Sequence, residues 1–311
     1  MNFSSHSPIC SQLASSGVSV PEWRPNFLTS EMSVALISVT IVNVLVSPLT
    51  IFLNVLVILA VKITPQLKDK YNVLLACLAG TDITTGALGQ PLFIAELIYR
   101  LTGSPESEFC IIPHATRGLT RAFGLISLYH LALISMERYI SIKFPFKYHD
   151  IVTNRRLIVC NVLAWLQVLT AAFLRYSDVV FSYPLFGFAV FLSIFILIFC
   201  RIASYYEARK RIGNITTQSA RAKFLKEKKA LKTTSFVIGL VFLFYVPMIL
   251  FKVVFAPLIS SPETFLVLES LMSTLLLCGS VSNPVVYCAR SRQYRQAFRK
   301  LLHIANNVQP L

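Results

Sequence analysis

The chain has 311 residues, of which 55% are hydrophobic and only 14% are charged, and its mean hydropathy is +0.65. Soluble domains carry about 25% charged residues, so this chain has too few charges to cover a water-facing surface. The formal net charge is +15, from 29 Lys and Arg against 14 Asp and Glu. Such an excess is typical of nucleic-acid-binding proteins or of membrane proteins with basic inner loops. The hydropathy favours the membrane, and we expect no nucleic-acid partner.

Seven apolar stretches are long enough to cross a bilayer, which takes about 20 residues per helix. They are residues 33–63, 71–98, 116–142, 157–173, 179–202, 233–255 and 264–287. We therefore predict an all-α membrane protein whose seven-transmembrane helix bundle occupies residues 33–288. Residues 1–32 contain no signal-peptide core and are expected to form an extracellular N-terminal tail.

The basic residues are divided unevenly between the two sets of connections. One set contains Lys68 and Lys70, Arg155 and Arg156, and the basic run 209–232. The other set contains only Arg24, Arg100, Arg117, Arg121, Arg175 and Lys252. Because Lys and Arg concentrate in cytoplasmic loops, the first set is expected inside the cell. An odd number of spans then places the N-terminus outside, as in a multi-pass plasma-membrane protein.

An ionisable residue, Asp82, lies within the second predicted span. A charged side chain at that depth costs about 2.5–3.5 kcal/mol on insertion, so the carboxyl group needs polar partners. Asn283 in the seventh span can donate a hydrogen bond to it. Two interpretations stay open: a protonated Asp bonded between helices, or a cation or proton site in the bundle interior.

The polar residues of the third span recur at intervals that place them on one helical face. They are Arg117, Thr120, Arg121, Gly124 and Ser127, and Arg138 continues the same face. Such a face points into the bundle or into a water-filled cavity. We expect Arg117 and Arg121 to line an outward-opening pocket. The alternative is that both side chains extend to the outer headgroups.

The inner end of the third span reads Glu137-Arg138-Tyr139, where adjacent charges can pair at the membrane boundary. Glu227, at the start of the sixth span, is a candidate acid for the same Arg. An ordinary basic flank that contains one acid is the alternative. Pro247 in the sixth span and Pro284 in the seventh are each expected to kink their helices.

Residues 289–311 are predicted to form an amphipathic helix and a short cytoplasmic tail. Tyr294, Phe298, Leu301 and Leu302 fall on one stripe of this helix, and the basic residues fall on the other. This pattern is typical of a helix that lies on the inner leaflet, so membrane lipids are expected partners.

Together these residues resemble the rhodopsin-like (class A) G-protein-coupled receptors, from about residue 54 to residue 300. The matching landmarks, in chain order, are Asn54, Leu78-Ala79-x-x-Asp82, Glu137-Arg138-Tyr139, Pro145, Trp165, Pro247 and Asn283-Pro284-x-x-Tyr287. The short outer loop without Cys and the missing fifth-helix Pro look like the melanocortin branch. The segment 290–300 looks closer to the adenosine receptors.

The resemblance implies a receptor rather than an enzyme. An extracellular ligand would bias a two-state bundle, and the sixth helix would swing outward at Pro247 to open a cleft for a heterotrimeric G protein. That movement would break the pairing between Arg138 and Glu227. The residues that the resemblance assigns to the switch and to coupling are Glu137, Arg138, Tyr139, Pro145, Phe146, Glu227, Pro247, Asn283, Pro284 and Tyr287.

The resemblance also implies an allosteric sodium ion and no other cofactor. The residues expected around the ion are Asp82, Ser127, Ser280 and Asn283. Gly279 stands where the family keeps an Asn beside this site, and Tyr245 stands where the family keeps a Trp in the sixth helix.

The residues expected in the ligand pocket are Glu96, Arg117, Thr120, Arg121, Tyr245, Lys252 and Glu269. Thr120 stands where aminergic receptors keep an Asp, which disfavours an amine. The cations favour an anionic small molecule, lipid or peptide through charge-assisted hydrogen bonds. Pairing of Glu96 and Glu269 with these cations would weaken that preference.

Two features are expected outside the cell. Pro113 occupies the position of the family's third-helix Cys, and the resemblance, adapted to the two outer cysteines, gives a Cys10–Cys110 disulfide, with two free thiols as the alternative. Asn2 begins a glycosylation sequon.

A small transporter or channel that uses Asp82 and the Arg face is the alternative function.

Overall fold

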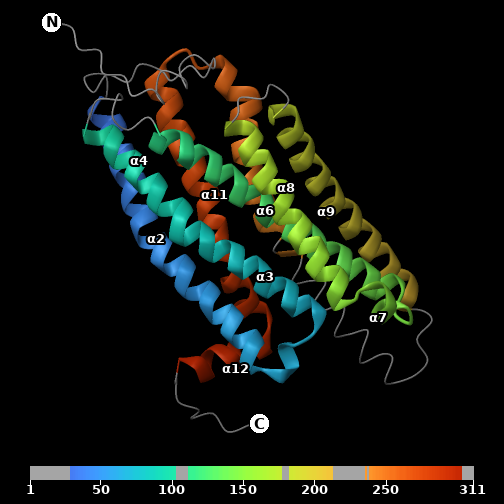
Figure 1. The fold of residues 1–311 in the computed structure, drawn as a ribbon. Coiled ribbons are helices and arrows are strands. Elements are labelled where there is room, and N and C mark those ends of the chain that lie inside the picture. The colour runs from blue at the N-terminus through green and yellow to red at the C-terminus, as the bar shows by residue number, and fades with distance from the viewer. Residues whose placement is uncertain (1–28, 103–110, 177–181, 213–234, 237, 303–311) are drawn as a thin grey trace, which may run out of the picture.

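The computed structural model describes residues 29–102, 111–176, 182–212, 235–236 and 238–302, and Figure 1 shows their long helices side by side in one bundle. Each of the seven predicted spans corresponds to helical structure within these residues. Predictions for Asn2, Cys10, Cys110 and Glu227 lie outside the described residues. The side chain of Arg117 does too, although its backbone is helical.

The first span is α2, Ser30–Ile63, which begins three residues before the predicted start at Ser33. Thr29 caps this helix, because its hydroxyl accepts a hydrogen bond from the backbone N–H of Met32 at 3.3 Å. The cap provides an acceptor for a backbone N–H of the first turn, and the pattern of apolar residues gives no information about this hydrogen bond. The helix therefore begins at the cap rather than at the first apolar residue.

The second span is divided into three helical segments: α3 (Lys70–Thr84), a π-helical turn η3 (Thr85–Gly89) and α4 (Gln90–Thr102). The π-helical turn packs against α2, where Ser47 Oγ donates to the carbonyl oxygen of Gly86 at 2.8 Å. A Cβ atom added at Gly86 would lie 3.0 Å from Ile51 Cγ1 and 3.2 Å from the backbone oxygen of Ser47. A side chain at this position would therefore push the contacting groups of α2 a few tenths of an ångström away.

The third to fifth spans are longer than the apolar stretches that predict them. They are α6 (Ile111–Lys143), α8 (Asn154–Tyr176) and α9 (Ser182–Ile212), with a short helix α7 (Tyr148–Ile151) between the first two. Helix α6 is central, because it packs against α3, α8 and α9. Helix α9 continues ten residues beyond the predicted end at Ile202, since polar and basic residues extend a helix as well as apolar ones do.

The sixth span runs from Ile238 to Leu258 and includes a π-helical turn η4 (Phe251–Phe255) and a 3-10 turn η5 (Ala256–Leu258). The seventh is α11, Pro262–Arg290, which continues through Pro284. The predicted amphipathic helix is α12, Arg292–Leu301. On α12, Tyr294, Ala297 and Phe298 are buried against the bundle rather than facing the inner leaflet, whereas Leu302 of the predicted stripe is 42% exposed.

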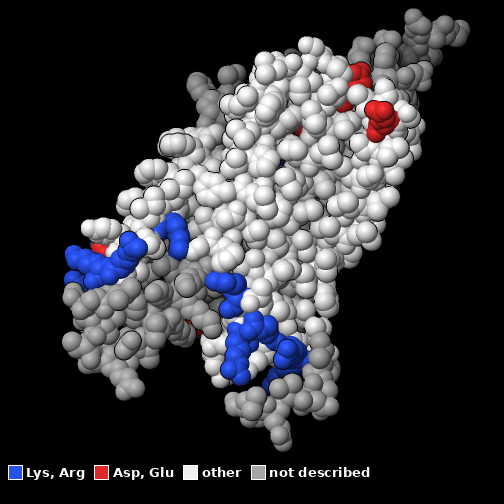
Figure 2. All heavy atoms as spheres, turned by 180° about the vertical axis from the view of Figure 1, so that it is seen from behind, with Lys and Arg blue, Asp and Glu red and all other residues white. Residues whose placement is uncertain are grey.

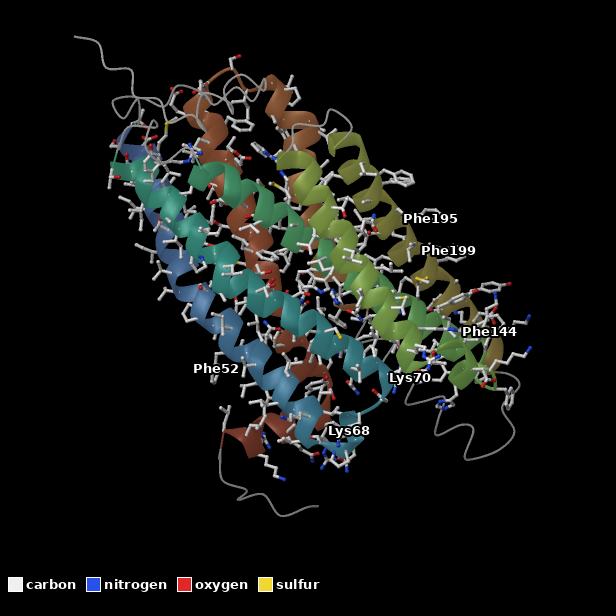
Figure 3. The ribbon with its side chains drawn as sticks, viewed as in Figure 1. Phe52, Lys68, Lys70, Phe144, Phe195 and Phe199 are labelled. Atoms are coloured by element: carbon white, nitrogen blue, oxygen red, sulfur yellow. The ribbon has the colours of Figure 1, made fainter. Side chains whose placement is uncertain are left out.

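The outer surface of the bundle is apolar. Five helices are individually long and apolar enough to cross a membrane within the described residues. Phe52 on α2 and Phe195 and Phe199 on α9 point away from the bundle in Figure 3, and each is at least half exposed. Large apolar patches on a protein surface mark contact with a membrane or with another protein. These faces suit the acyl chains of a bilayer.

Charge separates the two ends of the bundle. Figure 2 shows Lys and Arg side chains gathered at the end that carries α12, which we call the basic end, and acidic side chains at the opposite end. Lys68 and Lys70 lie at the basic end, as labelled in Figure 3. The spatial separation agrees with the uneven distribution of basic residues along the sequence.

Replacement of Gly86 by Ala is expected to destabilise the protein by about 1–3 kcal/mol, because it overpacks the contact between α2 and η3. Gly80→Ala in α3 is the matched control, since a Cβ atom there meets nothing within 4 Å. Thermal unfolding of both purified variants in the same detergent measures the difference. Equal melting temperatures for the two variants would contradict the packing argument.

Candidate functional site

A buried polar cluster around Asp82 joins three helices near the middle of the bundle. Asn283 Nδ2 of α11 donates to Asp82 Oδ2 of α3 at 2.9 Å, which is the contact expected from the sequence. The hydroxyls of Ser127 on α6 and Ser280 on α11 lie beside the same carboxyl group. All four residues are more than nine-tenths buried.

Asp82 Oδ1 has no hydrogen-bond partner among the described residues, although it is buried. A buried carboxylate oxygen without a donor is costly, unless a proton or a cation occupies the space beside it. Hard cations prefer oxygen ligands such as carboxylates and hydroxyls. The donor set therefore fits a small monovalent cation.

A Cβ atom at Gly279 would lie 3.4 Å from Phe244, so a larger side chain there would contact the sixth span.

A second polar cluster joins α3, α6 and α7 at the basic end. The Glu137 carboxylate accepts hydrogen bonds from Nε and Nη2 of Arg138, and both side chains are buried. Tyr148 of α7 donates its hydroxyl to the same carboxylate. The Arg138 guanidinium also lies over the Tyr71 ring, 4.3 Å from its centroid. The predicted pairing of adjacent charges is therefore present, with two aromatic partners.

Tyr148 and Tyr71 were not predicted as members of this cluster. Lys70 fixes α7 against α3, since its ammonium donates to the carbonyl of Val152 and lies 5.2 Å from the Tyr148 ring centroid. Burial raises the pKa of the Tyr148 phenol, so it remains a hydrogen-bond donor at neutral pH. The only sequence signal for Tyr148 as a member of this cluster was its position three residues after Pro145. The spacing of the sequence gave no such signal for Tyr71.

The other switch residues occupy different environments. Tyr139 faces α9, where its ring meets Phe199 edge-on at 6.3 Å, and its hydroxyl accepts a hydrogen bond from Lys143 at 2.6 Å. Tyr287 is 1% exposed and packs against Tyr294, with ring centroids 5.7 Å apart. Phe146, in the turn after Pro145, is 98% exposed. A Phe that protrudes this far takes no part in packing among the described residues.

A cavity of about 550 Å³ lies in the half of the bundle away from the basic end. Its wall includes Thr120 and Arg121 of α6 and Tyr245 and Lys252 of the sixth span, which are four of the predicted pocket residues. The rest of the described wall is apolar or Gly: Gly118, Ala122, Gly124, Leu125, Leu128, Val168, Phe186, Gly187, Val190, Phe191, Ile194, Met248, Ile249, Val253 and Leu276.

The two predicted acids do not line this cavity, which corrects the sequence analysis. Glu96 accepts a hydrogen bond from Arg100 at 2.6 Å, one turn along α4, rather than facing the cations of α6. Glu269 of α11 forms an ion pair with Lys252. Neighbouring basic side chains thus hold both carboxylates, and Glu269 compensates the positive charge of Lys252 at the cavity.

Tyr245 connects the cavity to the helix packing. Its hydroxyl donates to the backbone carbonyl of Gly124 on α6 at 2.9 Å. A Cβ atom at Gly124 would contact the Tyr245 ring at 3.8 Å. The sixth span and α6 are therefore held together by one hydrogen bond at the cavity wall, where an occupant of the cavity would contact it.

A buried histidine was also missed by the sequence analysis. His130 of α6 is fully buried, and its Nε2 lies 2.7 Å from Asn161 Oδ1 of α8. Its Nδ1 lies 2.8 Å from the carbonyl oxygen of Ile126. These contacts tie α6 to α8. A lone His in an apolar stretch carries no spacing signal that could have revealed them.

Comparisons with known proteins support the resemblance. Residues 53–177 match the family model described as 7 transmembrane receptor (rhodopsin family). The adenosine receptor A2a of Homo sapiens is 25% identical over 314 residues, which cover 86% of this chain and 73% of the relative. The histamine H2 receptor of Rattus norvegicus is 28% identical over 296 residues, which cover 86% and 80%.

The family match over residues 53–177 and the seven-span bundle support the similarity of the chain to the rhodopsin-like (class A) G-protein-coupled receptors. Within that class its relatives lie near the adenosine branch. These similarities and the apolar helices support a multi-pass plasma-membrane receptor for an extracellular ligand rather than an enzyme. The relatives are receptors, which favours this class over a transporter or channel.

Replacement of Tyr148 by Phe is expected to lower the free energy of unfolding by about 1.5–3 kcal/mol, because the Glu137 carboxylate loses a donor to a charged group. Tyr206→Phe on α9 is the control, since that side chain is 70% exposed. Thermal unfolding of the purified receptor measures both changes. A Tyr148→Phe variant as stable as the control would show that α7 does not hold the ion pair.

Proposed function

We propose that this receptor transmits the binding of an extracellular ligand to a heterotrimeric G protein by outward movement of the sixth span. The observation that carries the proposal is the buried cluster of Glu137, Arg138, Tyr148 and Tyr71, which joins α6, α7 and α3 at the basic end. In this proposal the basic end is cytoplasmic and the N-terminus is outside, in accord with the charge distribution.

The proposed coupling runs through α6 and the sixth span. A ligand in the cavity would contact Tyr245, whose hydrogen bond to Gly124 holds the two helices together. Pro247 lies two residues further along and lacks a backbone N–H, so the helix has one fewer hydrogen bond to break when it bends. The π-helical turn at Phe251–Phe255 begins four residues after Pro247, and such turns are frequent at functional sites.

The energy scale suits a ligand-driven switch. Breaking a buried ion pair by removing one partner costs about 3–5 kcal/mol. A ligand shifts a two-state equilibrium only by its difference in affinity for the two states, and about 5.5 kcal/mol moves a population from 1:99 to 99:1. In the open state, Arg138 would turn from Glu137 towards the G protein, Tyr287 would support the new packing, and Phe146 would enter the G-protein surface.

The chemistry of the cavity favours an anionic ligand. Arg121 presents a guanidinium group with five donors, which suits a carboxylate or a phosphate. Lys252 adds less, because Glu269 compensates its charge. This choice agrees with the absence of an acid at position 120, where Thr120 lines the wall.

A sodium ion is proposed as the allosteric modulator. Asp82 and Asn283, with the Ser127 and Ser280 hydroxyls, would hold it, and the Asp82 oxygen without a donor is the position that it would satisfy. When bound, the ion neutralises the carboxylate charge within the bundle. The residues themselves hold α3, α6 and α11 together and thereby favour the closed arrangement.

Phe146→Ala is expected to reduce nucleotide exchange on the G protein at least tenfold while leaving ligand affinity unchanged, because the exposed ring lies at the basic end, away from the cavity. The measurement is a ligand-library screen of the receptor in lipid nanodiscs against several G-protein classes. Phe144→Ala, at a neighbouring ring that is 41% exposed, is the matched control. Ion flux without nucleotide exchange would favour a channel instead.

Asp82→Asn is expected to abolish any effect of sodium on agonist affinity, because the amide cannot supply the negative charge that attracts the cation. Titration of agonist binding in sodium chloride and in choline chloride measures the effect. Ser282→Ala, one residue before Asn283, controls for local packing in α11, since its hydroxyl donates to the carbonyl of Gly279. A sodium effect that survives in Asp82→Asn would rule out this site.

A further inference from the structure

We propose that the cavity binds a single-chain lipid anion, with its head at Thr120 and Arg121 and its tail along the apolar wall. The inference names the class of ligand that this cavity binds. It rests on the proposed function in one respect, because it takes the cavity as the ligand-binding site. Four observations carry it: the composition of the wall, a buried hydroxyl without a partner, the open space at two glycines and the apolar rim.

The wall is apolar except at a few positions. Among its described residues only Thr120, Arg121, Tyr245 and Lys252 carry polar side chains. The Tyr245 hydroxyl is bonded to Gly124, and the Lys252 ammonium is paired with Glu269. A ligand that displaces water from such a wall gains most from an alkyl chain, because burial of apolar surface supplies the driving force. A polar peptide or a small hydrophilic anion would leave most of this wall without an apolar contact.

The polar end of the cavity suits one anionic head. Thr120 is only 8% exposed, and its Oγ1 has no hydrogen-bond partner among the described residues. A buried hydroxyl without a partner costs free energy unless a ligand atom bonds to it. Arg121 lines the same end, and with five donors it can bind an oxyanion alongside any other contact that it makes. A hydroxyl and a guanidinium together match a carboxylate or a phosphate monoester.

The length of the cavity suits a chain rather than a compact ligand. The wall on α6 continues from Arg121 to Leu128, seven residues further, which spans about 10 Å at 1.5 Å per residue. Gly118 and Gly187 also line the cavity, and a Cβ atom at either would meet nothing within 4 Å. The wall of the cavity therefore carries few kinds of chemical group, and the cavity has unfilled space beside both glycines.

The rim of the cavity is apolar and exposed. Phe191 on α9 is 66% exposed, Val253 on the sixth span is 69% exposed, and both border the cavity. Phe195, one turn further along α9, points outward from the bundle in Figure 3. A bilayer would surround this rim with acyl chains. A lipid tail can therefore pass between α9 and the sixth span without crossing a polar surface.

The test is direct binding to the full-length receptor in phosphatidylcholine nanodiscs without a G protein. The probes are dodecanoate, dodecyl phosphate, hexanoate and dodecanol. Saturable binding is expected for the first two, and the two arms distinguish a fatty acid from a lipid phosphate as the source of the head group. Affinity should fall about fourfold for each methylene removed, at about 0.8 kcal/mol per methylene. Dodecanol, which lacks the charge, should bind at least tenfold more weakly.

Two variants locate the probe. Arg121→Gln should weaken binding of dodecanoate about 10- to 100-fold, because a charge-assisted hydrogen bond is lost. Gly187→Leu should also weaken it at least tenfold by filling the cavity. Its matched control is Gly239→Leu, at a position that is likewise open and lies outside the cavity wall. Thermal unfolding of each variant checks that the bundle is intact.

The result that would overturn the inference is equal binding of dodecanol and dodecanoate, or dodecanoate binding unchanged by Arg121→Gln. A peptide or a short hydrophilic anion that activates the G protein and requires Arg121 would also overturn it, while the proposed function would stand. Saturable binding of the lipid anion without any nucleotide exchange would instead support the inference and contradict the proposed function. The two failures therefore give different results.

Discussion

The cost of placing charge and unpaired amide groups in an apolar environment constrains this bundle more than any other factor. Asp82 and Asn283 illustrate it, because each would be expensive alone within a bilayer, and each gains a hydrogen-bond partner in the other across α3 and α11. The contact fixes the relative height and rotation of two helices that are 201 residues apart in sequence. Apolar packing could not do this by itself, since lipid tails solvate apolar side chains as well as neighbouring helices do.

The same constraint operates at both ends of α6. At the basic end Glu137 and Arg138 neutralise each other, and Tyr148 and Tyr71 complete their contacts. Toward the opposite end, polar groups are sparse, and the Tyr245 hydroxyl finds a backbone carbonyl instead of a side chain. One helix therefore carries a tightly paired closed end and a loosely filled cavity. The cavity can therefore be occupied without direct contact with the ion pair.

The positions that depart from the family pattern gather around the sixth span. Tyr245 replaces the expected Trp, and its smaller ring with a hydroxyl is held by a hydrogen bond to α6. Gly279 replaces an Asn and leaves Phe244 of the sixth span close to α11. Each change exchanges a polar or bulky contact for a closer approach between helices. The groups between the cavity and the basic end therefore differ from the family pattern at these two positions.

The sequence alone determined the membrane class, the seven spans, the amphipathic helix and the contact between Asp82 and Asn283, because length, hydropathy and the cost of buried charge act locally along the chain. It did not determine where the helices begin, since capping by residues such as Thr29 depends on one hydrogen bond. The partners of side chains at the helix ends were decided by tertiary structure. Glu96 faces Arg100, and Tyr148 reaches Glu137, because rotation and loop geometry choose among several nearby groups that spacing cannot rank.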